Sequence, residues 1–193
     1  EVDLGLVSYL KQTYPLLRDR IIAADFLKLP LTQLHPGPVS IIGNFPYNIS
    51  TQILFKMLEW KGEVECMIGM FQKEVAQRAA AKEGNKVYGV LSVLVQAFFE
   101  VEYLFDVNEQ CFTPPPKVKS GVIRLLPKKK VIGMKNEKAF FLLVKTAFNQ
   151  RRKTLRNAVK GLFDATILED ELFNKRAEQL TVQQFADLTF RMK

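Results

Sequence analysis

Histidine and cysteine are scarce in this chain, and their scarcity excludes two common kinds of site. The sequence has one histidine, His35, and two cysteines, Cys66 and Cys111, far apart. None of them has a partner at the spacing of a zinc site, and His35 falls in "QLHPGP", which is typical of a loop. We therefore expect no metal site and no Ser–His triad, and interpret the cysteines as reduced, packed thiols.

Long apolar segments are missing too. No stretch of 18 or more apolar residues occurs, so no transmembrane helix is expected. The N-terminal stretch "EVDLGLVSYL" is acidic, lacks the order of a signal peptide and has no initiator Met. We expect a cytoplasmic protein with no membrane partner, and interpret residue 1 as a start inside a longer protein.

Acidic residues become scarce only in the last third of the chain. Residues 1–127 hold 13 Lys/Arg and 13 Asp/Glu, whereas residues 128–193 hold 15 Lys/Arg and 7 Asp/Glu. The whole net charge of +8 therefore belongs to the last third. Such a concentrated positive field favours a polyanionic partner, with nucleic acid first and an anionic membrane surface second.

Short apolar runs alternate with helical patterns through the first two thirds. Strand-like runs occupy 19–25, 39–44, 64–72, 99–107 and 120–127, and helical spacing occupies 4–14, 50–60, 73–82 and 88–99. The alternation predicts an α/β fold with a mainly parallel sheet covered on both faces. Such sheets bind ligands at the carboxyl ends of their strands, where Asp25 and Asn44 fall. Ser50 or Thr51 could cap the helix that follows Asn44.

The pattern changes near residue 128. "PKKKVIGMKNE" suits a linker, and residues 138–148, 151–163 and 181–192 then show helical periodicity without a strand signal. We predict a domain over residues 1–127 and a small all-helical domain over residues 128–193, linker included.

The stretch "IIGNFPYNIST" ends a predicted strand with an unusual set of residues. Transfer of a methyl group to an exocyclic base amine needs acceptors on the amine's N–H bonds, because they favour the geometry that frees its lone pair. The Asn44 side-chain carbonyl and the Phe45 backbone carbonyl could serve, on a turn that Pro46 stiffens. Tyr47 offers a face on which a flipped base stacks. Alternatively, the motif is only a turn.

A second feature is the stretch 145–160, with six Lys/Arg and no Asp/Glu. Arg152, Arg156 and Lys160 would share one face of a helix, where they repel one another unless phosphates bind. A solvated helix face is the alternative. Lys117, Lys119 and Lys128–Lys130 could extend this surface towards the site.

The order of these motifs resembles the KsgA family of small-subunit ribosomal RNA adenine dimethyltransferases. "NFPYNIST" is similar to the family's Asn-Leu-Pro-Tyr-Asn-Ile-Ser-Thr signature, with Phe45 in place of Leu. The resemblance continues through "FQKEVAQR", "YGVLSVLVQ", "CFTPPPKVKS", "AFNQRRKTLRN" and "RAEQLTVQQFADL". It covers essentially the whole chain. It implies a Rossmann-like class I methyltransferase sheet, truncated at the N-terminus, with a small C-terminal helical domain.

The resemblance also implies roles for individual residues. The target amine site would be Asn44, Phe45, Pro46 and Tyr47, with Phe112 stacking on the other face of the adenine. The cofactor would be S-adenosylmethionine, held by Glu1, Asp25 and Asn44. The RNA-binding residues would be Lys117, Lys119, Arg151, Arg152, Lys153, Arg156 and Lys160.

Each implied role has a plainer alternative. Phe112 could be a core residue, Asp25 a helix cap or loop carboxylate, and Glu1 part of a frayed terminus. The substrate implied is a pair of adjacent adenosines near the 3′ end of small-subunit rRNA, presented by an immature 30S-type particle to a monomeric enzyme.

One departure from the family concerns the cofactor. The family has a Gly-rich loop after its first strand, but none of the ten glycines here forms a G-x-G arrangement. We therefore expect these 193 residues alone to bind S-adenosylmethionine weakly or not at all, and to be inactive without the missing segment, whereas the full-length parent should be the enzyme.

Three other functions stay open on the sequence. An Erm-type methyltransferase acting on large-subunit rRNA shares the motif, although "FTPPPKVKS" and "RRKTLRN" fit the small-subunit family better. A DNA adenine methyltransferase uses a similar Asn-Pro-Pro-Tyr motif. A non-catalytic assembly factor for the small subunit would need only the RNA-binding surface.

Overall fold

A computed structural model describes residues 1–31 and 34–193, and also the backbone of Thr32 and Gln33. The chain forms two compact units, residues 1–38 and residues 39–193, and each is described here by itself. The domain boundary expected after residue 127 stays a prediction.

The first unit is helical. It contains α1 (Leu4–Thr13), as predicted, a 3₁₀ helix (Pro15–Arg20), a shorter 3₁₀ turn (Phe26–Lys28) and α2 (Leu31–Leu34). The strand predicted over 19–25 is wrong. Its first part continues the 3₁₀ helix, and beyond it the ladder-like bonds among the described residues are two, both to Glu1: the Ala24 N–H donates to the Glu1 carbonyl at 2.9 Å, and the Glu1 amino group donates to the Ile22 carbonyl at 3.1 Å. A strand needs a partner of several residues to form a ladder.

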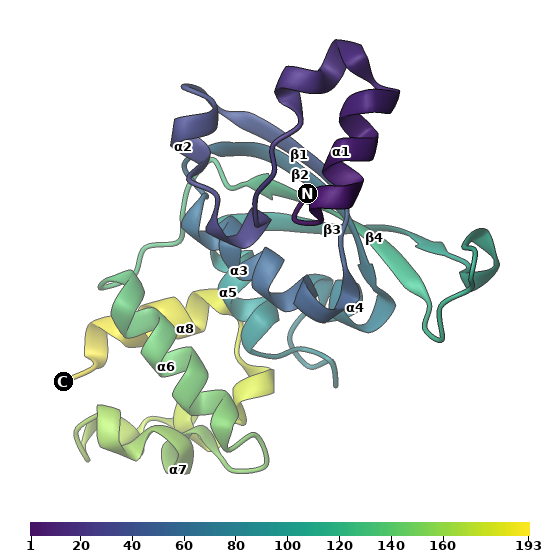
Figure 1. Ribbon diagram of the computed structural model, residues 1–193. Helices are drawn as coiled ribbons and strands as arrows, with labels where there is room; N and C mark the ends of the chain where they lie inside the picture. Colours follow the sequence, from purple (N-terminus) through teal and green to yellow (C-terminus); the bar gives the residue numbers. More distant parts are fainter. The chain divides into compact units, whose positions relative to one another are not determined.

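The second unit is built on a four-stranded sheet (Figure 1). Its strands are β1 (Val39–Asn44), β2 (Val64–Gln72), β3 (Phe99–Val107) and β4 (Ser120–Pro127). The order is β1-β2-β4-β3, with β1 parallel to β2 and β4 antiparallel to both its neighbours. The expectation of a mainly parallel sheet is wrong for these strands. Between β3 and β4 the connection (residues 108–119, all described) carries only a 3₁₀ turn (Glu109–Cys111) and no α-helix that could cross over the sheet, so the chain returns in the opposite direction.

Three helices cover one face of this sheet: α3 (Ser50–Glu59), α4 (Lys73–Ala80) and α5 (Val90–Phe98). The strand residues beneath them, such as Met67 and Phe71, are fully buried. On the opposite face Ile42 is 85% exposed, so within residues 39–193 the expected cover on both faces is not found. The predicted cap of α3 is also wrong, because Ile49 precedes the helix and Ser50 is already helical.

The segment after residue 128 is helical, as predicted. It consists of α6 (Glu137–Asn149), α7 (Leu155–Val159) and α8 (Val182–Leu188), with 3₁₀ turns between α7 and α8. Both α6 and α8 pack against α5, which joins this segment to the helices on the sheet. The buried Tyr88 hydroxyl donates to the Leu180 carbonyl at 3.0 Å. Burial raises the pKa of Tyr88 well above its ordinary value, so it stays a donor.

The helix predicted over 151–163 is largely wrong, since only α7 and a following 3₁₀ turn form. Thr154 has an extended backbone, and the Leu155 N–H donates to the Lys175 carbonyl at 2.7 Å. Leu155 is fully buried. This distant contact sets the start of α7 and leaves residues 151–153 in a turn.

Candidate active site

The carboxyl end of β1 carries the Asn-x-Pro-Tyr stretch. Asn44 pairs with Met70 on β2, and the Phe45 N–H donates to the Met70 carbonyl at 3.3 Å. Pro46, with φ −58°, then directs the chain out of the sheet into a 3₁₀ turn (Tyr47–Ile49) that leads to α3. The stretch is thus fixed to the sheet on one side and to a helix on the other.

The Phe45 ring is a packing element. It is 8% exposed and lies against the Phe71 ring with centroids 5.3 Å apart. Gly43 makes room for it, because a Cβ there would meet the Phe45 Cζ at 2.7 Å, and Gly69 does the same from β2. With its ring buried, Phe45 can act at the site only through its backbone, as the sequence interpretation holds.

A cavity of about 340 Å³ opens at this strand end. Its lining consists of Asn44, Phe45, Pro46, Tyr47, Phe112, Pro114 and Pro116. The structure therefore brings together the five residues assigned to the target amine, although Phe112 comes from the connection between β3 and β4. The cavity is of ordinary ligand-binding size and can admit one base.

Asn44 is exposed, and among the described residues its side-chain amide has no hydrogen-bond partner. In a simple turn, an Asn side chain bonds to the backbone two residues on. No such bond is found for Asn44, which weakens the alternative that the motif is only a turn. The amide is available to a molecule in the cavity.

Tyr47 is held by a residue that the sequence analysis missed. Its hydroxyl is hydrogen-bonded to Ser120 Oγ, and Ser120 is fully buried at the start of β4. The partners lie 73 positions apart, so no local pattern could pair them. The bond fixes one edge of the Tyr47 ring at the wall of the cavity.

We expect this hydrogen bond to set the catalytic orientation of Tyr47. Tyr47→Phe and Ser120→Ala should each lower kcat/KM by roughly three- to tenfold, since a hydrogen bond contributes about 0.5–1.5 kcal/mol. The double variant should be no worse than either single variant, because both remove one shared interaction. Methylation kinetics of the three variants test this, and additive losses would contradict it.

The connection over residues 108–119, which carries Phe112, is anchored near both ends. The Lys73 ammonium and the Tyr103 hydroxyl both donate to the Asp106 carboxylate, and these bonds lower the pKa of Asp106. The Lys73 N–H donates to the Lys119 carbonyl at 2.8 Å. The first residue of α4 thus holds the base of this connection.

Of the three residues assigned to the cofactor, Glu1 and Asp25 lie in the first unit and Asn44 in the second. Glu1 Oε1 accepts from the N–H groups of Val2 and Asp3 at 2.8 and 3.0 Å, which lowers the pKa of Glu1. Asp25 Oδ1 accepts from the Leu27 N–H at 3.0 Å and so caps a 3₁₀ turn. For Asp25 the plainer reading as a cap therefore holds, and its role in cofactor binding stays a prediction.

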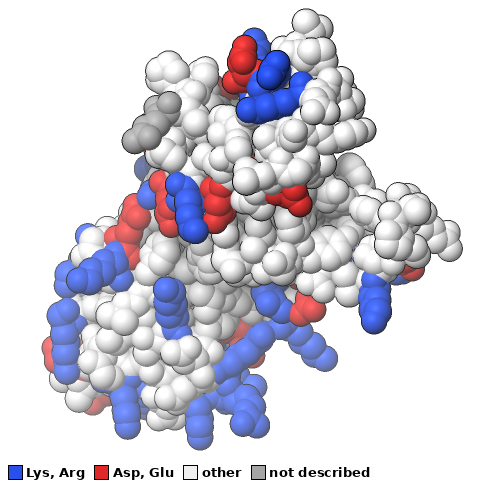
Figure 2. All heavy atoms as spheres, viewed as in Figure 1, with Lys and Arg blue, Asp and Glu red and all other residues white. Residues whose placement is uncertain are grey.

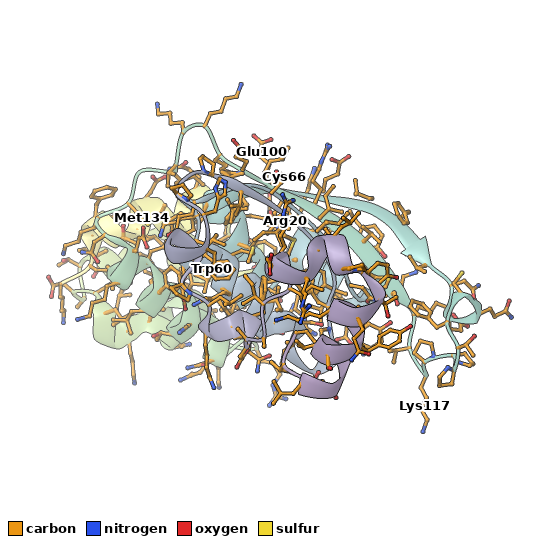
Figure 3. The ribbon with its side chains drawn as sticks, turned by 45° about the horizontal axis from the view of Figure 1, so that its top comes forward. Arg20, Trp60, Cys66, Glu100, Lys117 and Met134 are labelled. Carbon is orange, nitrogen blue, oxygen red and sulfur yellow. The ribbon has the colours of Figure 1, made fainter. Side chains whose placement is uncertain are left out.

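The predicted basic residues fall in separate places. Lys117 and Lys119 are exposed on the connection that carries Phe112, and Figure 3 shows Lys117 pointing into solvent. Lys128–Lys130 follow the far end of β4, about 27 Å away for a strand of eight residues. The expectation that Lys128–Lys130 extend the surface towards the site is therefore wrong.

Residues 151–160 do not present one helical face. Arg152 and Lys153 are exposed in the turn before α7, Arg156 is half-buried within it, and Lys160 is exposed after it. The prediction that Arg152, Arg156 and Lys160 stack along a helix is wrong, because α7 spans only five residues. Residues 128–193 still hold 15 Lys/Arg against 7 Asp/Glu, and Figure 2 shows Lys and Arg spread over the surface of this part of the chain.

The scarce residue types give no further site. Cys66 is half-buried, but Cys111 is exposed, so the expectation of two packed thiols is wrong for Cys111. Among the described residues, no group of His, Cys, Asp and Glu could hold a metal ion. None of the helices in the described ranges has the length and apolar character to cross a bilayer.

A strand-end Asn-x-Pro-Tyr turn beside an aromatic cavity, on a mixed sheet with helices, defines a Rossmann-like class I methyltransferase acting on an amine. Comparisons with known proteins identify the family. Residues 1–192 match the ribosomal RNA adenine dimethylase family, and the chain belongs to it.

Curated relatives match nearly the whole chain. The ribosomal RNA small subunit methyltransferase A of Cytophaga hutchinsonii is 55% identical over 190 residues, covering 98% of this chain and 74% of the relative. The protein of that name from Bacteroides fragilis is 56% identical over 192 residues, covering 98% and 71%.

Solved structures share the fold. A dimethyladenosine transferase from Plasmodium falciparum has a TM-score of 0.82 at 25% identity, covering 97% of this chain and 78% of that chain. The 23S rRNA methyltransferase ErmE has a TM-score of 0.69 at 22% identity, covering 97% and 80%. The latter likeness concerns the fold alone.

Proposed function

We propose that this protein dimethylates the N6 amines of two adjacent adenosines near the 3′ end of small-subunit rRNA, with S-adenosylmethionine as methyl donor. The observation that carries the proposal is the cavity in which Asn44, Tyr47 and Phe112 meet. The relatives named as small-subunit methyltransferases support the choice of rRNA. The substrate would be presented on an immature small subunit in the cytoplasm, to a monomeric enzyme.

Two oxygens would activate the target amine. The adenine N6 lone pair is delocalised into the ring and is a poor nucleophile until the amine becomes pyramidal. Asn44 Oδ1 and the Phe45 carbonyl would accept from its two N–H bonds and favour that geometry. Because the strand end and Pro46 fix the backbone that carries both groups, the Phe45 carbonyl needs little reorganisation when charge develops, and only the side-chain torsions of Asn44 have to be set by the bound base. After the first transfer one N–H remains, so the cavity must also admit a methyl group.

Two aromatic rings would hold the base. The target adenosine must leave its stack to reach the strand end, and Tyr47 and Phe112 line the cavity from different parts of the chain. Base–aromatic stacking contributes about 1–3 kcal/mol per base. Stacking between the rings would compensate for unstacking from the RNA and align the amine with Asn44.

The residues assigned to the cofactor have suitable chemistry. Glu1 uses one carboxylate oxygen for local N–H groups and leaves the second to accept from ribose hydroxyls. Asp25 uses one oxygen for the Leu27 N–H, and its second lies 3.5 Å from Lys28 Nζ, where it can still accept from an adenine amine. When bound, S-adenosylmethionine supplies a methyl group activated by a sulfonium. The leaving thioether is neutral, so this chain needs no strong acid, and the proton that N6 loses on methylation would pass to solvent.

The direct test is to incubate the full-length protein with immature small subunits and S-adenosylmethionine and to map the modified bases. We expect two dimethylated, adjacent adenosines near the 3′ end of the small-subunit rRNA. Primer extension on small-subunit and large-subunit rRNA distinguishes this activity from that of an Erm-type methyltransferase. Modification confined to large-subunit rRNA, or to DNA, would overturn the proposal.

A non-catalytic assembly role is the second candidate, and it would use the excess of Lys and Arg over residues 128–193 (Figure 2). The two roles can coexist in one protein. Particle binding measured separately from methylation distinguishes them.

The Phe112 ring provides the next prediction. Phe112→Leu keeps an apolar side chain but removes the aromatic face, so kcat/KM should fall about tenfold, within the range of one base–aromatic stack. Phe105→Leu is a matched control, since Phe105 is 57% exposed on β3 and does not line the cavity. Equal effects of the two substitutions would argue against stacking by Phe112.

A further inference from the structure

A second cavity, of about 490 Å³, lies where α3 and α4 face the chain that follows α6. Its lining includes Phe55, Glu74, Arg78, Lys86, Phe148 and Arg151. The methyl-transfer site uses none of these residues. Only Arg151 was assigned a role from the sequence, as part of a general RNA-binding surface.

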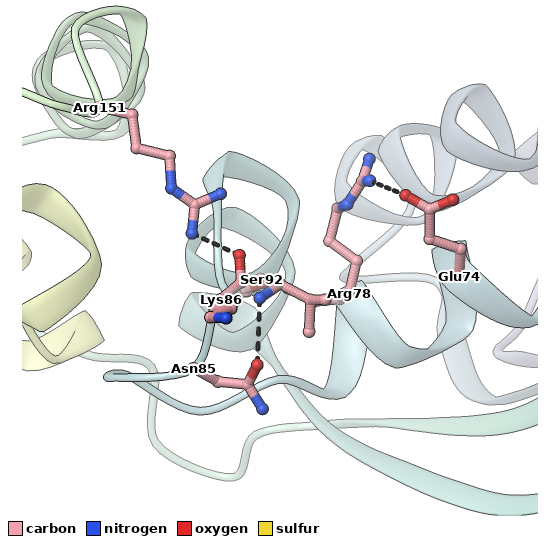
Figure 4. A network of polar contacts seen from close by, with 7 residues as sticks. Glu74, Arg78, Asn85, Lys86, Ser92 and Arg151 are labelled. Carbon is pink, nitrogen blue, oxygen red and sulfur yellow. Dashed lines mark hydrogen bonds and ion pairs between the residues drawn. The ribbon is translucent and has the colours of Figure 1, made fainter.

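The rim of this cavity is cationic and partly preorganised (Figure 4). Arg78 donates to Glu74 Oε1 at 2.6 Å, and Arg151 donates to the Lys86 carbonyl and lies 3.4 Å from Glu178 Oε2. These contacts fix the two guanidinium groups but use only part of their five N–H donors. Both side chains remain about two-fifths exposed, at 42% and 43%.

Lys86 adds a third cation. It is exposed, and within the described ranges its ammonium has no partner. Glu74 is already paired with Arg78, so the open side of the cavity carries excess positive charge. The exposed Arg152 and Lys153 follow Arg151 directly and have no acidic neighbour in sequence.

The interior of the cavity is apolar and aromatic. Phe55 and Phe148 are half-buried in its wall. Phe148 packs on Tyr88 and Phe185, with ring centroids 6.1 and 5.9 Å apart, which fixes its plane. An aromatic wall beneath a cationic rim matches the two parts of a nucleotide, a base that stacks and a phosphate that pairs with Lys or Arg.

The two cavities are neighbours along one short segment. Tyr47 lines the first and Thr51 lines the second. Between them the chain runs through a 3₁₀ turn directly into α3, a rise of roughly 6–8 Å for four helical residues. Tyr47 and Thr51 are therefore close enough for one RNA strand to contact both.

We propose that the second cavity binds a single unstacked nucleotide that flanks the target adenosine in the same RNA strand. Its base lies against Phe148 and Phe55, and its phosphate pairs with Arg78, Lys86 and Arg151. The identity of the strand rests on the proposed function, whereas the nucleotide site itself does not. The pocket would fix the register of the strand, so that a defined base reaches Asn44.

The test uses an RNA hairpin with two adjacent adenosines in its loop, and copies with one abasic nucleotide at successive flanking positions. We expect one abasic position to weaken binding to the unaltered enzyme about tenfold, the loss of one stacked base. The Phe148→Leu variant should bind the intact RNA and the RNA abasic at that position with equal affinity. If no position matters, or if Phe148→Leu weakens both RNAs alike, the pocket holds no base.

Salt dependence tests the phosphate contact. Lys86→Gln and Arg78→Gln should each reduce the slope of log Kd against log salt concentration, and the double variant should reduce it by about 0.7, the value in a single strand for the one phosphate that these cations share. Lys138→Gln is the matched control, because it lies in the first turn of α6, about 15 Å along the axis from Phe148. Unchanged slopes in both test variants would overturn the proposal.

These measurements read binding and not methylation, so their failure is distinct from failure of the proposed function. Thermal unfolding of each variant identifies any loss of folding. Arg78→Gln also breaks the ion pair with Glu74, whereas Lys86→Gln breaks no contact. If the salt slopes of the two variants disagree, the slope of Lys86→Gln decides the outcome.

Discussion

Asn44→Ala should abolish most dimethylation while leaving the protein folded and bound to its particle. Removing one preorganised group that stabilises developing charge typically lowers kcat by roughly 10²–10³-fold. The Asn44 side chain is exposed and makes no hydrogen bond within the described ranges, so its removal should cost little stability. Single-turnover methylation of immature small subunits measures the loss.

Asn48→Ala is the matched control for that experiment. Asn48 is exposed in the next turn and does not line the cavity, so its truncation should change the rate little. Co-sedimentation with the small subunit separates binding from chemistry. If Asn44→Ala still dimethylates at the normal rate, the mechanism proposed for the amine is wrong. If it binds but no longer methylates, catalytic and assembly roles coexist.

The elements predicted correctly from sequence are those whose signal is local. Residues 39–44 have the apolar pattern of a strand and form β1. Residues 50–60 repeat with the period of a helix, and α3 forms there. Residues 19–25 have an equally apolar pattern but form no strand, because a strand also depends on its partner. The helix over 151–163 failed for a similar reason, since Leu155 bonds to Lys175 from 20 residues away.

The site residues show the same difference between local and distant signals. Asn44, Pro46 and Tyr47 are adjacent in sequence, so their convergence could be predicted from the strand end alone. Ser120 could not be predicted, because its bond to Tyr47 spans 73 positions. Arg151 was read as a free RNA-binding cation, whereas it also ties the loop before α5 to the turn after α6. Charge can be counted from a sequence, but the partner of each charge depends on the fold.

Gly43→Ala should disable the enzyme through packing alone. The added Cβ would lie 2.7 Å from the Phe45 Cζ, and Phe71 and Gly69 leave that ring no free space. Overpacking of this kind costs about 1–3 kcal/mol in the free energy of unfolding. Movement of the Phe45 backbone by even 1 Å can lower the rate by about 10²-fold. Chemical denaturation and methylation kinetics measure the two effects.

A second substitution makes this prediction specific. Phe45→Leu, which introduces the residue common in the family, shortens the side chain and should restore stability and most activity to Gly43→Ala. It should not rescue Gly69→Ala, whose Cβ would lie 2.6 Å from the Phe71 Cε2. Gly62→Ala, with nothing within 4 Å of its Cβ, should be neutral. Rescue of both glycine variants, or of neither, would show that the Phe45 ring does not transmit packing strain to the catalytic turn.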